Sequence, residues 1–253
     1  MVLAGFDLNL LSLAALFLAF AVGGIVKGAT GAGAPVVAIP VIAIFFDVQL
    51  AVIIMAVPNL ISNLLQIIHY RKVEINRVAV NRLAFSGALG CIFGTLILTN
   101  APAHFLEIIV ALSTALYISI RLLKPKLILP QHLFNSLSLP IGLAGGVIQG
   151  SSGISAPIAL SFLNAIKMTR ESFIFTISSF FGSMAAVQII ILGFLNMLSW
   201  PVIATSAAAL IPQLLFMPIG NVLIKKVSKK TFENIILMLL SFLCLKLIYS
   251  LFL

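Results

Sequence analysis

Long runs of apolar residues, separated by short polar segments, make up almost the whole chain. A run of about 20 residues spans the ~30 Å hydrocarbon core of a bilayer as an α-helix, which rises about 1.5 Å per residue. Apolar and polar positions do not alternate, as they would in the strands of a membrane barrel. The pattern therefore predicts an all-α polytopic membrane protein.

These runs repeat in the same order in two halves, residues 8–126 and 131–253. Each half is predicted to hold a hairpin of short or half-length helices followed by three transmembrane helices, because the second arm of the first hairpin is too short to cross. The hairpins cover residues 8–46 and 134–165. The transmembrane helices cover residues 50–69, 78–98 and 104–123 in the first half and 172–193, 201–224 and 232–252 in the second. Together the halves form one domain.

Composition agrees with a chain embedded in lipid. Of the 253 residues, 62% are hydrophobic and only 8% are charged, which excludes a soluble globular domain. The net charge of +9 does not indicate nucleic-acid binding, because the cations lie in short loops between apolar runs. Cys91 and Cys244 lie inside apolar runs, so we expect small core residues and no disulfide.

Equivalent loops of the two halves carry opposite charge patterns. Four cations follow the first transmembrane helix of the first half, and none lies in the counterpart, residues 193–199; four follow the second transmembrane helix of the second half, and none lies in residues 99–103. Because Lys and Arg mark cytoplasmic loops, the halves are predicted to be inverted, with both termini outside. The cations concerned are Arg71, Lys72, Arg77, Arg82, Lys225, Lys226, Lys229 and Lys230, with Arg121, Lys124 and Lys126 between the halves and Lys167 and Arg170 after the second hairpin.

A glycine-rich segment at residues 23–35 is written a second time at residues 145–157, at one offset (145 − 23 = 122). Glycine and proline positions coincide, while Thr30 corresponds to Ser152 and Gly33 to Ser155. A duplicated glycine-rich break that carries hydroxyl groups indicates a transporter site built from broken helices, with inverted repeats moving around it.

Such breaks can hold an anion. Helices starting near Gly31 and Gly153 would direct free backbone N–H groups and positive dipole ends to the centre of the protein, and Pro35 and Pro157, the helix-break prolines, suit the first helical turn. The predicted substrate-binding residues are the motif glycines, hydroxyls and polar groups together with two mid-span amides at the same offset: Lys27, Gly28, Thr30, Gly31, Gly33, Gln66, Gln149, Gly150, Ser151, Ser152, Gly153, Ser155 and Gln188.

Three alternatives stay open for these residues. Gly24, Gly28, Gly146 and Gly150 could serve only the close packing of helices. Lys27 could contact the anion or extend its ammonium to an interface. Asn59 and Asn63, on the same face as Gln66, could line the site or hydrogen-bond between helices.

Carboxylates are absent from the middle of the predicted spans, where a proton or sodium relay commonly needs one. Coupling, if present, would run through Lys27, His69 or the anion itself, so a coupling proton is one expected partner. We expect no cofactor, no metal ligand and no nucleic-acid partner beside a small anion and membrane lipid. Gly90 and Gly94 leave room for a helix contact in an oligomer, whose state the sequence leaves open.

The paired motifs, Gly24, Gly28, Gly31, Gly33 and Pro35 with Gly146, Gly150, Gly153, Ser155 and Pro157, resemble those of the sulfite exporter TauE/SafE family of bacterial membrane transporters. The resemblance implies a secondary transporter of the inner membrane that exports sulfite or organosulfonates. A passive anion channel would use the same site. Gly150-Ser151-Ser152-Gly153 also spells the G-x-S-G motif of an intramembrane serine hydrolase with Ser152 as nucleophile, but the duplication explains it better, so we expect no enzyme.

Overall fold

The computed structural model describes residues 2–3, 6–7, 9–123, 128–166, 168–226 and 229–250, so Lys124, Lys126 and Lys167 lie outside the described residues. A two-residue antiparallel ladder, β1 (Val2–Leu3) with β2 (Phe6–Asp7), precedes the helices. The helices are α1 (Leu10–Thr30), α2 (Ala34–Ala43), α3 (Val48–His69), α4 (Arg77–Asn100), α5 (Ala103–Leu123), α6 (Gln131–Ser152), α7 (Ala156–Ala165), α8 (Arg170–Phe194), α9 (Trp200–Lys226) and α10 (Lys229–Ser250).

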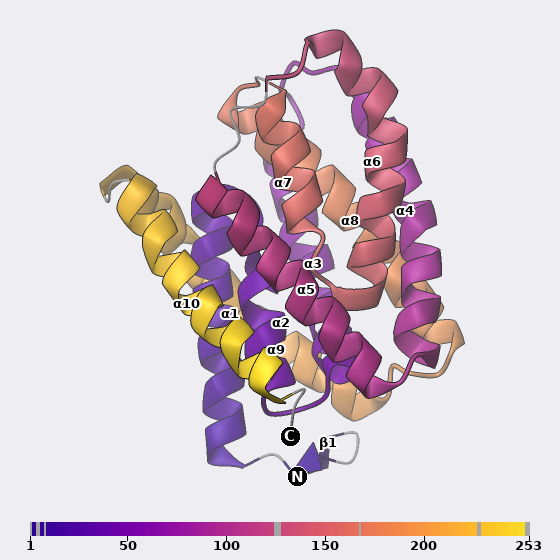
Figure 1. Cartoon of the computed structure of the whole chain (residues 1–253), viewed down its shortest axis with the longest axis vertical. Helices are drawn as coiled ribbons and strands as arrows, with labels where there is room; N and C mark the ends of the chain where they lie inside the picture. Colours follow the sequence, from indigo (N-terminus) through magenta and orange to yellow (C-terminus); the bar gives the residue numbers. More distant parts are fainter. Residues whose placement is uncertain are drawn as a thin grey trace.

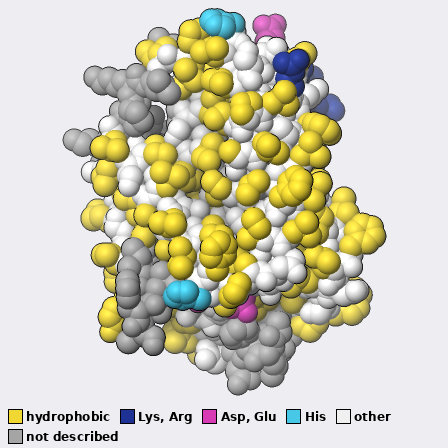
Figure 2. All heavy atoms as spheres, turned by 45° about the vertical axis from the view of Figure 1, so that its right-hand side comes forward, with side chains coloured by type: hydrophobic (Ala, Val, Ile, Leu, Met, Phe, Trp, Pro, Cys, Tyr) yellow, Lys and Arg dark blue, Asp and Glu magenta, His cyan; other side chains and the backbone are white. Residues whose placement is uncertain are grey.

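The predicted all-α polytopic membrane fold is confirmed. Among the described residues, six helices are long and apolar enough to cross a bilayer: α1, α3, α4, α5, α8 and α9. Figure 2 shows a broad apolar band over one face of the protein, with the Lys and Arg side chains of that face gathered at its upper end. Large hydrophobic side chains such as Phe85, Phe93 and Phe194 are exposed, as a lipid-facing surface requires.

The first arm of each hairpin is longer than predicted. α1 has 21 residues and α6 has 22, whereas α2 and α7 have 10 each. The prediction of short or half-length helices was wrong for α1 and α6, because the motif residues up to Thr30 and Ser152 continue these helices. Lys27, Gly28 and Thr30 remain helical, and α1 ends only where Gly31 takes the left-handed conformation, with φ of 80°.

Helix contacts between the halves come in matched pairs. α1 packs along α9, and α6, at the equivalent position in the second half, packs along α4, the equivalent of α9 (Figure 1). α3 packs on its own equivalent α8, and α5 on its own equivalent α10. Exchanging the halves therefore leaves these four contacts unchanged, as a two-fold relation would. The opposite orientation of the halves in the membrane stays a prediction.

Glycines allow the paired helices to approach closely. A Cβ atom added at Gly24 would lie 2.3 Å from the Gln213 carbonyl oxygen, and one at Gly28 would lie 1.9 Å from that of Met217, both on α9. Gly146 on α6 lies equally close to α4, 2.1 Å from the Gly87 carbonyl oxygen. These glycines therefore lie at helix–helix contacts, as the helix-packing alternative expects.

On the α4 side, Gly90 and Gly94 are also covered within the chain. A Cβ atom at Gly90 would lie 2.2 Å from the carbonyl oxygen of Leu143, and one at Gly94 would lie 2.2 Å from that of Val147. Both partners belong to α6, so these two glycines serve an internal contact and leave no small-residue face there for an oligomer.

The cationic loop after α3 lies against the start of α8. Ser172 Oγ donates to the Glu74 carbonyl oxygen at 3.2 Å, and the Arg77 guanidinium lies 4.3 Å from the centre of the Phe175 ring. Arg170 therefore lies at the same end of the bundle as the first cation-rich loop, which is what opposed halves require under the positive-inside rule.

Candidate functional site

Both helix breaks lie inside the protein. The Gly31 N–H donates to the Lys27 carbonyl oxygen at 2.7 Å, and the Gly153 N–H donates to that of Gln149 at the same distance, with both glycines left-handed. Gly33, with φ of 96°, is also left-handed. A left-handed C-cap suits glycine, which lacks the Cβ that would clash. Each break thus redirects the chain within three residues.

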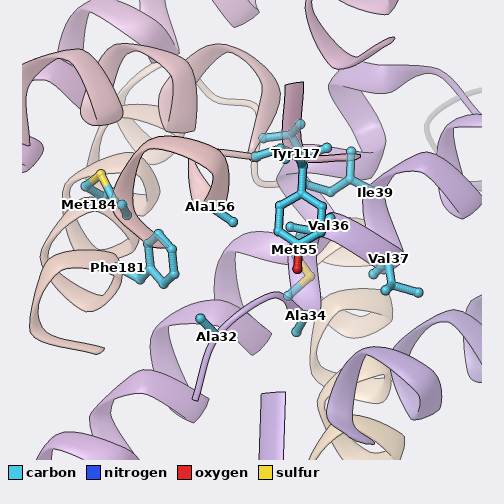
Figure 3. Packing of buried hydrophobic residues seen from close by; sticks show 14 of the residues in the cluster. Ala32, Ala34, Val36, Val37, Ile39, Met55, Tyr117, Ala156, Phe181 and Met184 are labelled. Carbon is cyan, nitrogen blue, oxygen red and sulfur yellow. The ribbon is translucent and has the colours of Figure 1, made fainter. Parts of the chain in front are cut away.

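The short helices that follow begin without side-chain caps. Pro35 and Pro157 lie in the first turns of α2 and α7, as predicted, and no side chain of the described residues caps either start. Figure 3 shows Ala32 and Ala34 of the first break and Ala156 of the second in one buried cluster. The free N–H groups of both helix starts therefore lie away from water, where a bound anion would satisfy them.

The motif hydroxyls bond to the protein itself. Thr30 Oγ1 donates to the Val26 carbonyl oxygen at 2.8 Å, Ser151 Oγ to that of Val147 at 2.9 Å, and Ser152 Oγ to that of Ile148 at 2.8 Å. Ser155 Oγ instead donates to Gln149 Oε1 at 2.8 Å. These groups are satisfied in this structure, and each bond joins a hydroxyl to its own helix or its own break.

Ser152 shows no catalytic arrangement. Besides its backbone partners, its hydroxyl lies 3.4 Å from Ser113 Oγ, and no histidine among the described residues bonds it. A serine nucleophile needs a base within hydrogen-bond reach.

Lys27 carries a buried ammonium group. Its side chain is 1% exposed, and Nζ donates to Asn63 Oδ1 on α3 at 2.7 Å. Asn63 in turn donates from Nδ2 to Asn59 Oδ1 at 2.8 Å. Lys27 therefore does not extend to an interface, and its bonded partner among the described residues is a neutral amide. A buried ammonium group raises the free energy of the folded protein unless an opposite charge lies beside it.

The mid-span amides Gln66 and Gln188 do not meet. Gln66 Oε1 accepts from Ser178 Oγ on α8 at 2.8 Å, whereas Gln188 Nε2 donates to the Gly150 carbonyl oxygen at 3.2 Å. Gln188 lies ten residues beyond Ser178 on α8 (188 − 178), which is about 15 Å along the helix. The two amides therefore bond to different helices, Gln66 to α8 and Gln188 to α6.

Gln213 on α9 is fully buried and bonds to the residue before Asn63, but it was not among the predicted site residues. Its Nε2 donates to Ser62 Oγ at 2.9 Å and to the Pro58 carbonyl oxygen at 3.1 Å. The available signal was an amide in the middle of an apolar run, but its equivalent in the first half is Cys91, so a search for matched pairs passes over it.

A comparison with known families matches the chain to the sulfite exporter TauE/SafE family over residues 16–247. The chain belongs to this family. Its members are transporters of sulfite and sulfonates, so the resemblance of the paired motifs is confirmed, and the chain is a multi-pass membrane protein of a transporter family rather than of an enzyme family. Neither curated proteins nor solved structures gave a match.

Within this TauE/SafE transporter, the two breaks carry different side chains. The first has the Lys27 ammonium, bonded to α3. The second has Gln149, which accepts from Ser155 Oγ and from the Ser155 N–H at 3.3 Å. The first break therefore carries a positive charge, whereas the second carries a neutral amide.

Proposed function

We propose that this protein is a secondary transporter that exports a small sulfur-containing anion, sulfite or an organosulfonate, across the bacterial inner membrane. The substrate binds beside Lys27, between the two helix breaks, and alternating access around this centre carries it across. Family membership supports the class of protein and a small anion as cargo.

The proposal rests on the buried charge of Lys27, unpaired among the described residues. Its ammonium is buried, and no ion pair joins it to an Asp or Glu among the described residues. An anion would supply the missing charge, and a charge-assisted hydrogen bond is about twice as strong as a neutral one. The uncapped starts of α2 and α7 support the same placement.

Three further parts of the proposal rest on the sequence. Loop charges support termini outside and a cytoplasmic loop between the halves. The inverted halves support alternating access. The lack of mid-span carboxylates supports coupling through Lys27, His69 or the anion itself, with a proton as the candidate coupling ion.

Binding of sulfite and a panel of sulfonates and carboxylates to the purified protein tests the proposal through ligand-induced thermal stabilisation. We expect sulfur oxyanions to stabilise the protein, and Lys27→Met to weaken their binding about 10- to 100-fold, the range for a hydrogen bond to a charged group. Lys27→Met should fold, because an apolar side chain of similar volume replaces a buried charge.

Lys226→Met is the matched control, because Lys226 is exposed at the end of α9. It should leave the affinity unchanged. If Lys27→Met binds every anion as the original protein does, the anion is not held at Lys27. In proteoliposomes, saturating flux with stimulation by substrate on the far side is expected for a carrier, whereas flux that rises in proportion to concentration would show a channel.

A further inference from the structure

One polar atom near Lys27 has no partner. Gln213 Oε1 is buried, and no hydrogen bond reaches it among the described residues, although the side chain is 0% exposed. A buried acceptor without a donor loses its hydrogen bonds to water and destabilises the folded protein. Such atoms in a native structure call for a partner that the chain itself does not supply.

The orientation of the Gln213 amide follows from its neighbours. Its Nε2 faces the carbonyl oxygen of Pro58 and the hydroxyl of Ser62, and this hydroxyl gives its own hydrogen to the Pro58 oxygen at 2.6 Å. If the amide were flipped, its oxygen would face the Pro58 carbonyl oxygen, which has no hydrogen to offer. The unpartnered atom is therefore the oxygen, an acceptor.

Gln213 packs against α1 one turn before Lys27. Gly24, one turn before Lys27 on the same side of α1, packs against the Gln213 backbone. The two polar side chains bond to successive residues of α3, Gln213 to Ser62 and Lys27 to Asn63. Both side chains therefore meet the same turn of α3, within one turn of each other along α1.

We infer that the substrate carries a hydrogen-bond donor as well as its negative charge, and that Gln213 is the residue that selects it. The inference rests on the proposed function, because Lys27 holds the oxyanion and Gln213 Oε1 accepts from an O–H or N–H of the same molecule. The substrate class is then a hydroxy- or amino-substituted sulfonate, or an oxyanion that keeps one acidic proton. A site built to hydrogen-bond such a group discriminates against the analogue that lacks it.

Matched pairs of sulfonates test the inference: 2-hydroxyethanesulfonate against ethanesulfonate, and hydroxymethanesulfonate against methanesulfonate. Within a pair the charge is the same and only the hydroxyl differs. We expect the hydroxylated member to bind the unmodified protein about tenfold more tightly, or about 1.4 kcal/mol. Gln213→Met should remove this preference while the affinity for ethanesulfonate stays within about twofold.

Asn135→Leu is the control, because Asn135 Oδ1 is also buried and without a partner among the described residues but lies in the first turns of α6, at the opposite end of that helix from the break. It should keep the preference. Equal binding of both members by the unmodified protein would overturn the inference without any variant, as would a preference that persists in Gln213→Met. Failure of the proposed function looks different: no sulfur oxyanion binds at all, or binding does not depend on Lys27.

Discussion

Replacing Gly146 by alanine tests whether the motif glycines act by letting helices touch. The added Cβ would lie 2.1 Å from the Gly87 carbonyl oxygen and 2.8 Å from the Cys91 nitrogen, both in the backbone of α4. Ordinary contact begins at 3.4 Å. Since neither partner is the end of a flexible side chain, α4 and α6 must separate by about 1 Å to accept the methyl group.

Overpacking of this kind costs about 1–3 kcal/mol, and contact between two backbones places Gly146→Ala at the upper end. Alanine returns up to about 1 kcal/mol through its higher helix propensity. We therefore expect a net loss of about 2 kcal/mol, which lowers the melting temperature by about 4–8 °C in a chain of this length.

The melting temperature can be followed with a thiol-reactive dye in detergent. Cys91 and Cys244 are free and buried, so they react only when the helices come apart. Gly193→Ala is the control, because its nearest neighbour would be Leu198 Cδ1 at 3.9 Å. It should leave the melting temperature unchanged or raise it slightly.

A Gly146→Ala variant that melts at or above the temperature of the unmodified protein would contradict this expectation. The close approach of α4 and α6 would then not depend on the glycine. A normal melting temperature combined with lost anion binding would instead favour a direct role of this motif position in the site.

Two further predictions concern Lys27 and the break prolines. Asn63→Leu leaves the Lys27 ammonium without its amide, so we expect a loss of about 3 kcal/mol in stability; the same change made together with Lys27→Met should cost at least about 1 kcal/mol less, and strictly additive losses in thermal melting would show that the two side chains are not coupled. Pro35→Ala and Pro157→Ala should each change stability by less than about 1 kcal/mol, because a first-turn residue needs no N–H partner within the helix. A larger loss in the same melting assay would mean that packing of the proline ring contributes to stability.

The helix breaks were predictable because their signal is local. Left-handed backbone needs glycine, so Gly31 and Gly153 mark the ends of α1 and α6 in the sequence itself. Pro35 and Pro157 mark the first turns in the same way. The full length of α1 was missed because Lys27 and Gly28 interrupt the apolar pattern without interrupting the helix.

The contacts across the centre were not predictable in this way. Gln213 and Ser178 form hydrogen bonds to residues of α3 that are far from them in the sequence. Neither has a polar residue at the equivalent position of the other half. Lys27 and Asn63 were both recognised as polar residues in apolar runs, but only the folded structure brings Lys27 of α1 to Asn63 of α3. A duplication identifies what the halves share, whereas the asymmetric residues are the ones that give a site its chemistry.

The matched pairing of helices also bears on how such a chain could arise. α1 packs on α9 and α6 packs on α4, so the broken-helix arm of each half is covered by the other half. A single half would leave its glycine face, such as Gly24 on α1, without the backbone it packs against. An ancestral unit of one repeat would therefore need a second copy to cover this face.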